Sequence, residues 1–250
     1  LRYGGQPLAT AAETWEGAAQ VDSVVMAGTP FRGFMGAFRD LVKGCATGRN
    51  AELLSPQALG SMPSIYQLLP VLEGRAARLV IPERIYDVRH WRDEGWGLLA
   101  HTEELVASAR AARYAYVAAQ LENSQHFFAR LHAPLCCRPR RAIPVLAIHG
   151  IGRKTLEHVE WGGGSDERLR FDRPAESVWR KRPNKIVANA GHSQTSSFGD
   201  GDDTVPVTSV PLPAALAEAM SVVRRETRAS HRTLYSDKRV QRSVLEFLAL

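Results

Sequence analysis

Cysteine is scarce in this sequence. The 250 residues include three cysteines, Cys45, Cys136 and Cys137, and the last two are adjacent in the chain. Adjacent cysteines cannot easily bridge to one another without strain, and an odd number leaves at least one thiol unpaired. The pattern argues against a disulfide framework, and it lacks the ligand spacing of a zinc site. The cysteines neither require nor exclude export from the cell.

Long apolar runs are also absent. No stretch approaches the roughly 20 apolar residues that a membrane-spanning helix needs, and the first residues lack the charged-then-apolar layout of a signal peptide. We therefore predict a soluble protein without a transmembrane segment, cytoplasmic by default, with its compartment left open. The sequence begins with Leu1 rather than methionine. We expect it to be a fragment of a longer protein or a processed product.

A strong excess of one charge is lacking too. Lys and Arg together number 32 against 26 Asp and Glu, which gives a net charge of +6. Because the basic residues are scattered and no basic motif with interleaved aromatic residues occurs, we predict a solvated surface and no nucleic-acid partner. An anionic lipid surface remains open as a partner. With 44% hydrophobic residues, the chain can bury a full core in one large domain or two small ones.

Short apolar runs alternate with segments of helical periodicity. The run from Val21 to Ala27 ends at Gly28-Thr29-Pro30, which predicts a buried strand leading into a tight loop. The periodicity predicts a core-packed helix over 31–43 and a long helix over 102–132 with Thr102 as its cap. Further strands are predicted over 143–148, 185–189 and 221–227, helices over 212–220 and 237–248, an irregular segment over 61–70 and a surface excursion over 161–172.

An acidic turn stands out from this background. Gly199-Asp200-Gly201-Asp202-Asp203-Thr204-Val205-Pro206 places three carboxylates beside two glycines and a proline, which predicts a loop that presents an acid, with an extended exit over 205–207. Downstream, His231 lies in a polar segment just before the last predicted helix. A histidine base in acyl transfer needs a buried acid on its far nitrogen, and acid followed by histidine is the chain order of α/β-hydrolases.

The nucleophile is missing from this pattern, because the sequence contains no Gly-x-Ser-x-Gly. The nearest candidate, Gly191-His192-Ser193-Gln194-Thr195, lacks the last glycine. Ser193 also lies too close to Asp202 for a serine and an acid that come from separate strands. His192 is a poor base because it precedes the acid loop.

Three other sets of residues have the composition of functional sites, but we predict no catalytic or metal-binding role for them. His149-Gly150-Ile151-Gly152 resembles an oxyanion-hole sequence, but it lies too late in the chain, so we interpret it as a turn after the strand over 143–148. His126 and His132 are spaced six residues apart, off a shared helix face, and we predict packing or surface roles. A calcium loop that starts at Asp200 would need glutamate where Pro211 stands. We predict no metal and no cofactor.

Several of these segments, taken in order, resemble the lecithin:cholesterol acyltransferase-like family. They are Tyr3-Gly4-Gly5, Val24-Val25-Met26-Ala27-Gly28-Thr29-Pro30-Phe31-Arg32-Gly33, Met62-Pro63-Ser64-Ile65-Tyr66-Gln67-Leu68-Leu69-Pro70, Pro144-Val145-Leu146-Ala147-Ile148-His149-Gly150, Gly201-Asp202-Asp203-Thr204-Val205-Pro206 and His231. The resemblance implies an α/β-hydrolase fold with a helical lid insertion. The hydrolase core would comprise residues 1–33 and 142–250, with the later strands of a mostly parallel sheet, and the lid 34–141.

The resemblance also implies site residues and an activity. Asp202 would be the catalytic acid, with Asp203 and then Asp200 as less favoured candidates, and His231 the base. The nucleophilic serine would lie upstream of residue 1, so that this chain alone would be inactive. The expected activity is a lipid acyltransferase or phospholipase that acts on a lipid ester through an acyl-serine, without a cofactor. Two alternatives remain: a non-catalytic, truncated hydrolase that binds lipid or a protein, and a triacylglycerol lipase of the same fold.

Overall fold

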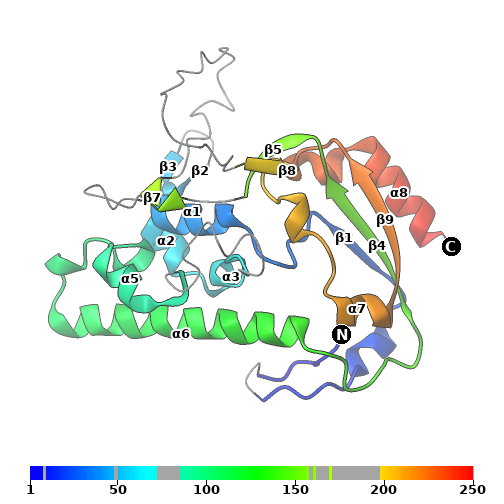
Figure 1. Ribbon diagram of the computed structural model, residues 1–250, viewed down its shortest axis with the longest axis horizontal. Helices are drawn as coiled ribbons and strands as arrows, with labels where there is room; N and C mark the ends of the chain where they lie inside the picture. Colours follow the sequence, from blue (N-terminus) through cyan, green and yellow to red (C-terminus); the bar gives the residue numbers. More distant parts are fainter. Residues whose placement is uncertain are drawn as a thin grey trace, which may run out of the picture.

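Three parallel strands form the central sheet in the part of the chain that the structure describes. The computed structural model describes residues 1–7, 10–47, 50–71, 85–157, 160–161, 169–170 and 198–249. Strands β1 (Val24–Ala27), β4 (Ile143–Gly150) and β9 (Met220–Thr227) lie in the order β1-β4-β9, and both neighbouring pairs are parallel. The strands predicted over 21–27, 143–148 and 221–227 are therefore neighbours in a mixed α/β structure (Figure 1).

Both faces of this sheet are covered. Alternate residues of β4 point to opposite faces, so Val145 and Ala147 join one buried cluster while Leu146 and Ile148 join another. The first cluster includes residues of helix α7 (Ala214–Ala219), and the second includes residues of helix α8 (Lys238–Leu248). Because apolar groups are needed on both faces, β1 and residues 143–148 of β4 are continuous apolar runs, whereas β9 becomes polar from Arg224 onward.

The helices predicted at the C-terminal end of the chain are confirmed. α7 and α8 lie within one or two residues of the predicted limits. Asp237 caps α8, as expected, because its Oδ1 accepts hydrogen bonds from the backbone N–H groups of Arg239 and Val240 at 2.9 and 3.1 Å.

A second group of helices lies to one side of the sheet (Figure 1). It contains α1 (Met35–Lys43), α2 (Pro56–Gly60), α3 (Pro63–Tyr66), α5 (Val88–Asp93), the 3-10 turns η3 (Gly97–Leu99) and η4 (Thr102–Glu104), and α6 (Ala107–His132). Phe38 of α1 is fully buried and meets the rings of Trp91 and Trp96 edge-on, at centroid distances of 6.0 and 5.0 Å. The helix predicted over 31–43 begins only at Met35, because Phe34 is extended, and it packs Phe38 on a core as predicted.

Antiparallel pairs and 3-10 turns complete the described structure. The pairs are β2 (Cys45–Thr47) with β3 (Asn50–Leu54), β5 (Arg153–Leu156) with β8 (Phe198–Gly201), and β6 (Glu160–Trp161) with β7 (Leu169–Arg170). The remaining 3-10 turns are η1 (Glu16–Gln20), η5 (Val207–Ser209) and η6 (His231–Ser236). Within the described ranges, no helix combines the length and the apolar character needed to cross a membrane.

The start of the long helix differs from the prediction. Thr102 begins the separate turn η4, and Leu105 and Val106 are extended, with ψ angles of 150° at both residues. This extended pair separates Thr102 from α6, so Thr102 does not cap the long helix.

Three shorter segments also differ from their predictions. His149 and Gly150 do not form an exit turn, because they still pair with Glu226 and Thr227 of β9. The segment over 61–70 is not wholly irregular, since a proline at the first turn starts α3. After Val205 the chain stays extended only through Pro206 and then turns into η5. The strand predicted over 185–189 and most of the excursion over 161–172 lie outside the described residues.

Candidate active site

The candidate site lies at the carboxyl ends of the parallel strands. Gly28 follows β1, Gly150 ends β4, and His231 comes soon after β9. The carboxyl ends of parallel strands meet at one edge of a sheet, where loops can gather functional groups from distant parts of the chain. The acid loop, which follows β8, joins them there through a hydrogen bond from the backbone N–H of His231 to the carbonyl oxygen of Asp202 at 2.8 Å.

Asp202 is held in a tight turn. Its side chain is 1% exposed, and its Oδ1 accepts hydrogen bonds from the backbone N–H groups of Thr204 and Val205 at 3.0 and 2.7 Å. The next residue, Asp203, adopts a left-handed conformation with φ of 76°, which aspartate tolerates better than most residues. An isolated bridge between Gly201 and Pro206 closes the loop. The second carboxylate oxygen, Oδ2, takes no part in these backbone contacts and faces the side chain of His231.

His231 is the partner of this carboxylate. Its Nδ1 lies 2.8 Å from Oδ2 of Asp202. The residue begins the 3-10 turn η6, whose start is held by a capping box between Ser230 and Thr233. The imidazole side chain is 35% exposed, whereas the carboxylate beneath it is buried. The histidine therefore has one face in contact with the protein and one open to a reacting group.

The hydrogen bond determines the form of the imidazole. A carboxylate oxygen only accepts, so Nδ1 carries the proton, and the neutral ring then has its lone pair on Nε2. Among the described residues, Asp202 provides the only hydrogen bond to the His231 side chain. A histidine held in this way can take a proton at Nε2, and the buried carboxylate stabilises the imidazolium that results.

Two glycines allow the acid and the histidine to approach the sheet. Gly28 has φ of 63°, and a Cβ atom there would lie 2.8 Å from Nδ1 of His231. A Cβ atom on Gly150 would collide with Cβ of Asp202. Both positions need glycine because a side chain would occupy the space of the dyad, which we define as Asp202 and His231.

The other two acids of the loop have different partners. Asp203 lies at the edge of ion-pair distance from Arg153, 4.0 Å away, and is 41% exposed. Asp200 accepts hydrogen bonds from the backbone N–H groups of Gly152 and Gly201 at 2.5 and 2.9 Å. Of the three acids that the sequence offered, the structure brings Asp202 alone to the histidine.

The remaining candidates of the sequence lie elsewhere. His149 lies 3.6 Å from Glu226 on the neighbouring strand, and Nε2 of His132 lies 3.2 Å from the carbonyl oxygen of Phe31. His192 and Ser193 fall outside the described residues. In the described part of the chain, no group of three or more His, Cys, Asp or Glu side chains is placed to hold a metal ion.

Sequence reasoning missed Thr155 as a support of the acid loop. This residue of β5 is fully buried, and its Oγ1 accepts a hydrogen bond from the backbone N–H of Asp203 at 3.0 Å. It lies 48 residues before its partner, and neither its spacing nor its local pattern marks it. The sequence predicts a turn at Gly28, but the closeness of Gly28 to His231 depends on the fold.

Comparisons with known proteins identify no family for this chain. Neither the scan against protein-family models nor the search of curated proteins finds a match.

Proposed function

We propose that this protein acts as a serine-dependent enzyme that transfers or hydrolyses the acyl group of a lipid ester. Asp202 would be its catalytic acid and His231 its base. The observation that carries the proposal is the 2.8 Å contact between Nδ1 of His231 and the buried carboxylate of Asp202. In acyl transfer, such a carboxylate orients the imidazole and stabilises its protonated form.

The placement of the dyad supports an α/β-hydrolase fold. The acid lies in the chain after the middle strand, β4, and the histidine follows β9, both beyond the carboxyl ends of parallel strands. This is the order in which α/β-hydrolases arrange acid and histidine. Residues 1–33 and 142–250 would then form the hydrolase core, and 34–141 the lid. The resemblance to lecithin:cholesterol acyltransferase-like enzymes favours a lipid ester as substrate.

The dyad would act on a serine hydroxyl. Nε2 of His231 takes the serine proton as the oxygen attacks the ester carbonyl, and then returns a proton to the departing alcohol. Water or a second alcohol afterwards releases the acyl group from the serine by the same steps. The resemblance places this serine in a Gly-x-Ser-x-Gly elbow ahead of the segment that matches residues 1–5.

The test measures hydrolysis of a p-nitrophenyl acyl ester by the natural full-length protein and its variants. We expect Asp202→Asn and His231→Ala each to lower kcat/KM by roughly a thousandfold, because each removes the base or its orientation. Asp203→Asn is the matched control. It changes a neighbouring carboxylate that does not contact His231, and asparagine tolerates the left-handed backbone there.

A fluorophosphonate probe makes the result decisive. The probe should label one serine of the wild-type protein, and the labelled peptide identifies the nucleophile, whether in an upstream elbow or at Ser193. Labelling should be slow in the His231→Ala variant. Full activity in either dyad variant would refute these roles. If the natural protein neither turns over esters nor takes the label, the alternative of a lipid- or protein-binding module replaces the enzyme.

A further inference from the structure

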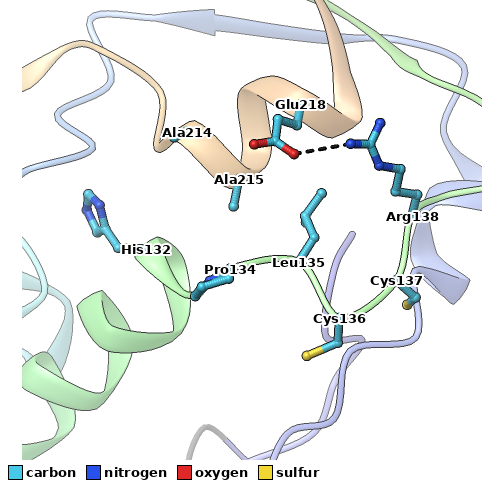
Figure 2. Close-up of a pocket in the computed structure, with 9 residues that line it drawn as sticks. All are labelled: His132, Pro134, Leu135, Cys136, Cys137, Arg138, Ala214, Ala215 and Glu218. Atoms are coloured by element: carbon cyan, nitrogen blue, oxygen red, sulfur yellow. Dashed lines mark hydrogen bonds and ion pairs between the residues drawn. The ribbon is translucent and has the colours of Figure 1, made fainter.

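A groove of about 500 Å³ lies between the linker that follows α6 and helix α7 (Figure 2). Its lining comprises His132, Pro134, Leu135, Cys136, Cys137, Arg138, Ala214, Ala215 and Glu218. None of these residues belongs to the acid loop or to the turn that carries His231. The dyad does not use this groove, so the function proposed above leaves its chemistry unexplained.

Two free thiols stand next to each other on one side of the groove. Cys136 and Cys137 are both exposed and unbridged, and Figure 2 shows them following one another along the linker, across from α7. Arg138 comes directly after them and lies at the rim, where it pairs with Glu218 at 3.2 Å. This arrangement combines two exposed thiols, an arginine paired with a glutamate, and an open cavity.

The backbone of the cysteine pair is tied to the N-terminal segment. The side chain of Glu13 accepts hydrogen bonds from the backbone N–H groups of Cys136 and Cys137 at 3.0 and 3.3 Å. The Cys137 sulfur lies 3.8 Å from the same carboxylate, and the carbonyl oxygen of Cys137 accepts from the indole N–H of Trp15 at 3.1 Å. Any change in the cysteine pair therefore reaches residues that are distant in sequence.

We propose that Cys136 and Cys137 form a thiol–disulfide exchange site whose substrate is a low-molecular-weight disulfide with carboxylate groups. The groove provides room for the small molecule beside the thiols. The guanidinium of Arg138, whose side chain is 67% exposed, uses one nitrogen to contact Glu218, and its other N–H groups can donate to the carboxylates of the small molecule.

The order of the steps follows from the surroundings of the two thiols. The Cys137 sulfur lies 3.8 Å from the Glu13 carboxylate, and desolvation and this carboxylate raise the pKa of Cys137; because its thiolate is disfavoured, Cys136 attacks first. A bond forms between the Cys136 sulfur and one sulfur of the small disulfide, whose own S–S bond breaks and releases a thiolate. Cys137 then gives up its proton and attacks the Cys136 sulfur, which releases the second thiolate.

The exchange balances and is readily reversed. The two cysteine sulfurs together lose two electrons, and the small disulfide is reduced to two thiols that take up the two protons. Neighbouring Cα atoms lie about 3.8 Å apart, below the roughly 4.4–6.8 Å of an unstrained disulfide. The bond between adjacent cysteines is therefore strained, and small thiols reduce it easily.

The oxidised pair should also change how the N-terminal segment is held. In the reduced form, two consecutive backbone N–H groups point at one carboxylate of Glu13. Closing a ring between neighbouring side chains rotates the two residues relative to each other, so both hydrogen bonds cannot persist. We expect faster amide hydrogen exchange over residues 10–20 in the oxidised protein than in the reduced protein.

The experiment follows the reaction of the reduced protein with oxidised glutathione by mass spectrometry of the peptide that contains both cysteines. The wild-type peptide should lose two hydrogens and retain no glutathione. In Cys137→Ser the glutathione adduct should accumulate on Cys136, because the resolving thiol is gone. Cys136→Ser should react about tenfold more slowly, since the thiol that remains lies beside the Glu13 carboxylate, which disfavours its thiolate.

Cys45→Ser is the matched control and should behave as the wild type does. Cystamine, a cationic disulfide, should react more slowly than oxidised glutathione, and equal rates would overturn the assigned class of substrate. The exchange site itself is refuted if wild-type protein and Cys137→Ser accumulate the same adduct, if Cys45 is the thiol modified, or if no cysteine reacts.

Discussion

At the scale of single residues, the dyad depends on a glycine that takes no part in its chemistry. Gly28 lies beside the imidazole ring, and its φ of 63° belongs to the left-handed region that glycine adopts readily. Its backbone N–H donates to the carbonyl oxygen of Ile148 at 2.9 Å, which holds the turn against β4. The histidine can thus lie close to the sheet only while this position has no side chain.

Gly28→Ala should displace His231 and lower esterase kcat/KM by about a hundredfold, since a shift of about 1 Å in a catalytic group can have that effect. Gly152→Ala is the matched control. Gly152 has φ of 81° and no atom within 4 Å of the added Cβ, so it has the same backbone strain without the collision. It should lower stability by about 1 kcal/mol and leave kcat/KM unchanged. Equal activities in the two variants would contradict this account of Gly28.

At the scale of elements, a short antiparallel pair positions the acid. β8 leads directly into the acid loop and pairs with β5, where Arg153 lies opposite Gly201 and Thr155 opposite Gly199. Oγ1 of Thr155 donates to the carbonyl oxygen of Arg153 and accepts from the backbone N–H of Asp203. The pair therefore fixes the turn from one side, while contact with His231 fixes it from the other.

We expect Thr155→Val to keep the shape of the side chain but to release the backbone N–H of Asp203. Esterase kcat should fall about tenfold with KM nearly constant, because a misplaced acid affects the transition state and not substrate binding. Thr155→Ser, which restores the hydroxyl, should recover most of the rate.

An independent measurement uses the proton on Nδ1 of His231, observed by NMR. In Thr155→Val its resonance should shift or broaden, while Thr155→Ser should resemble wild type. This measurement does not require catalytic activity, so it tests the positioning role even if the proposed reaction is wrong. An unchanged resonance in Thr155→Val would exclude that role.

At the scale of the whole molecule, a buried ion pair connects the N-terminal segment with the linker between α6 and β4. Arg2 and Glu13 form a salt bridge of 2.8 Å, and their side chains are 5% and 3% exposed. Arg2 also donates to the carbonyl oxygens of Ala133 and Pro134. Breaking one member of such a pair leaves the other charge buried without its partner, which is strongly destabilising.

The pair predicts how stability depends on pH. Desolvation raises the pKa of Glu13, but hydrogen bonds from the backbone of Cys136, from Arg2 and from Trp15 outweigh it and lower the pKa to about 2. The stabilising contribution is therefore complete above the ordinary value of 4.5 and is lost as the pH falls toward 2. With solvent screening taken into account, it amounts to roughly 1–2 kcal/mol of unfolding free energy.

Urea denaturation of Glu13→Gln at several pH values checks this expectation. The variant should be less stable than the wild type at pH 6, and the difference should shrink as the pH approaches 2. Glu16→Gln alters an exposed carboxylate nearby and should show no such trend. A difference between Glu13→Gln and wild type that does not change with pH would contradict the assigned ionisation.

Local patterns predicted much of the regular structure. Apolar runs identified β1 and β4, helical periodicity identified α1 and α6, and helix start and stop signals identified α7 and α8, because these signals lie within a few neighbouring residues. The start of α6 was wrong because Thr102 has the chemistry of a cap but belongs to a separate turn. Propensity describes which residues suit a cap, while the backbone path through Leu105 and Val106 decides where the helix begins.

The sequence by itself determined which residue types were available for the site. An acidic turn with glycines and a later histidine in a polar segment singled out Asp202 and His231, although their catalytic roles stay predictions. Only the tertiary structure decided that Asp202, and neither Asp200 nor Asp203, reaches the imidazole, because the backbone conformation of the turn directs each carboxylate separately. The support from Thr155 and the close approach at Gly28 arise from contacts between distant segments, which no local pattern encodes.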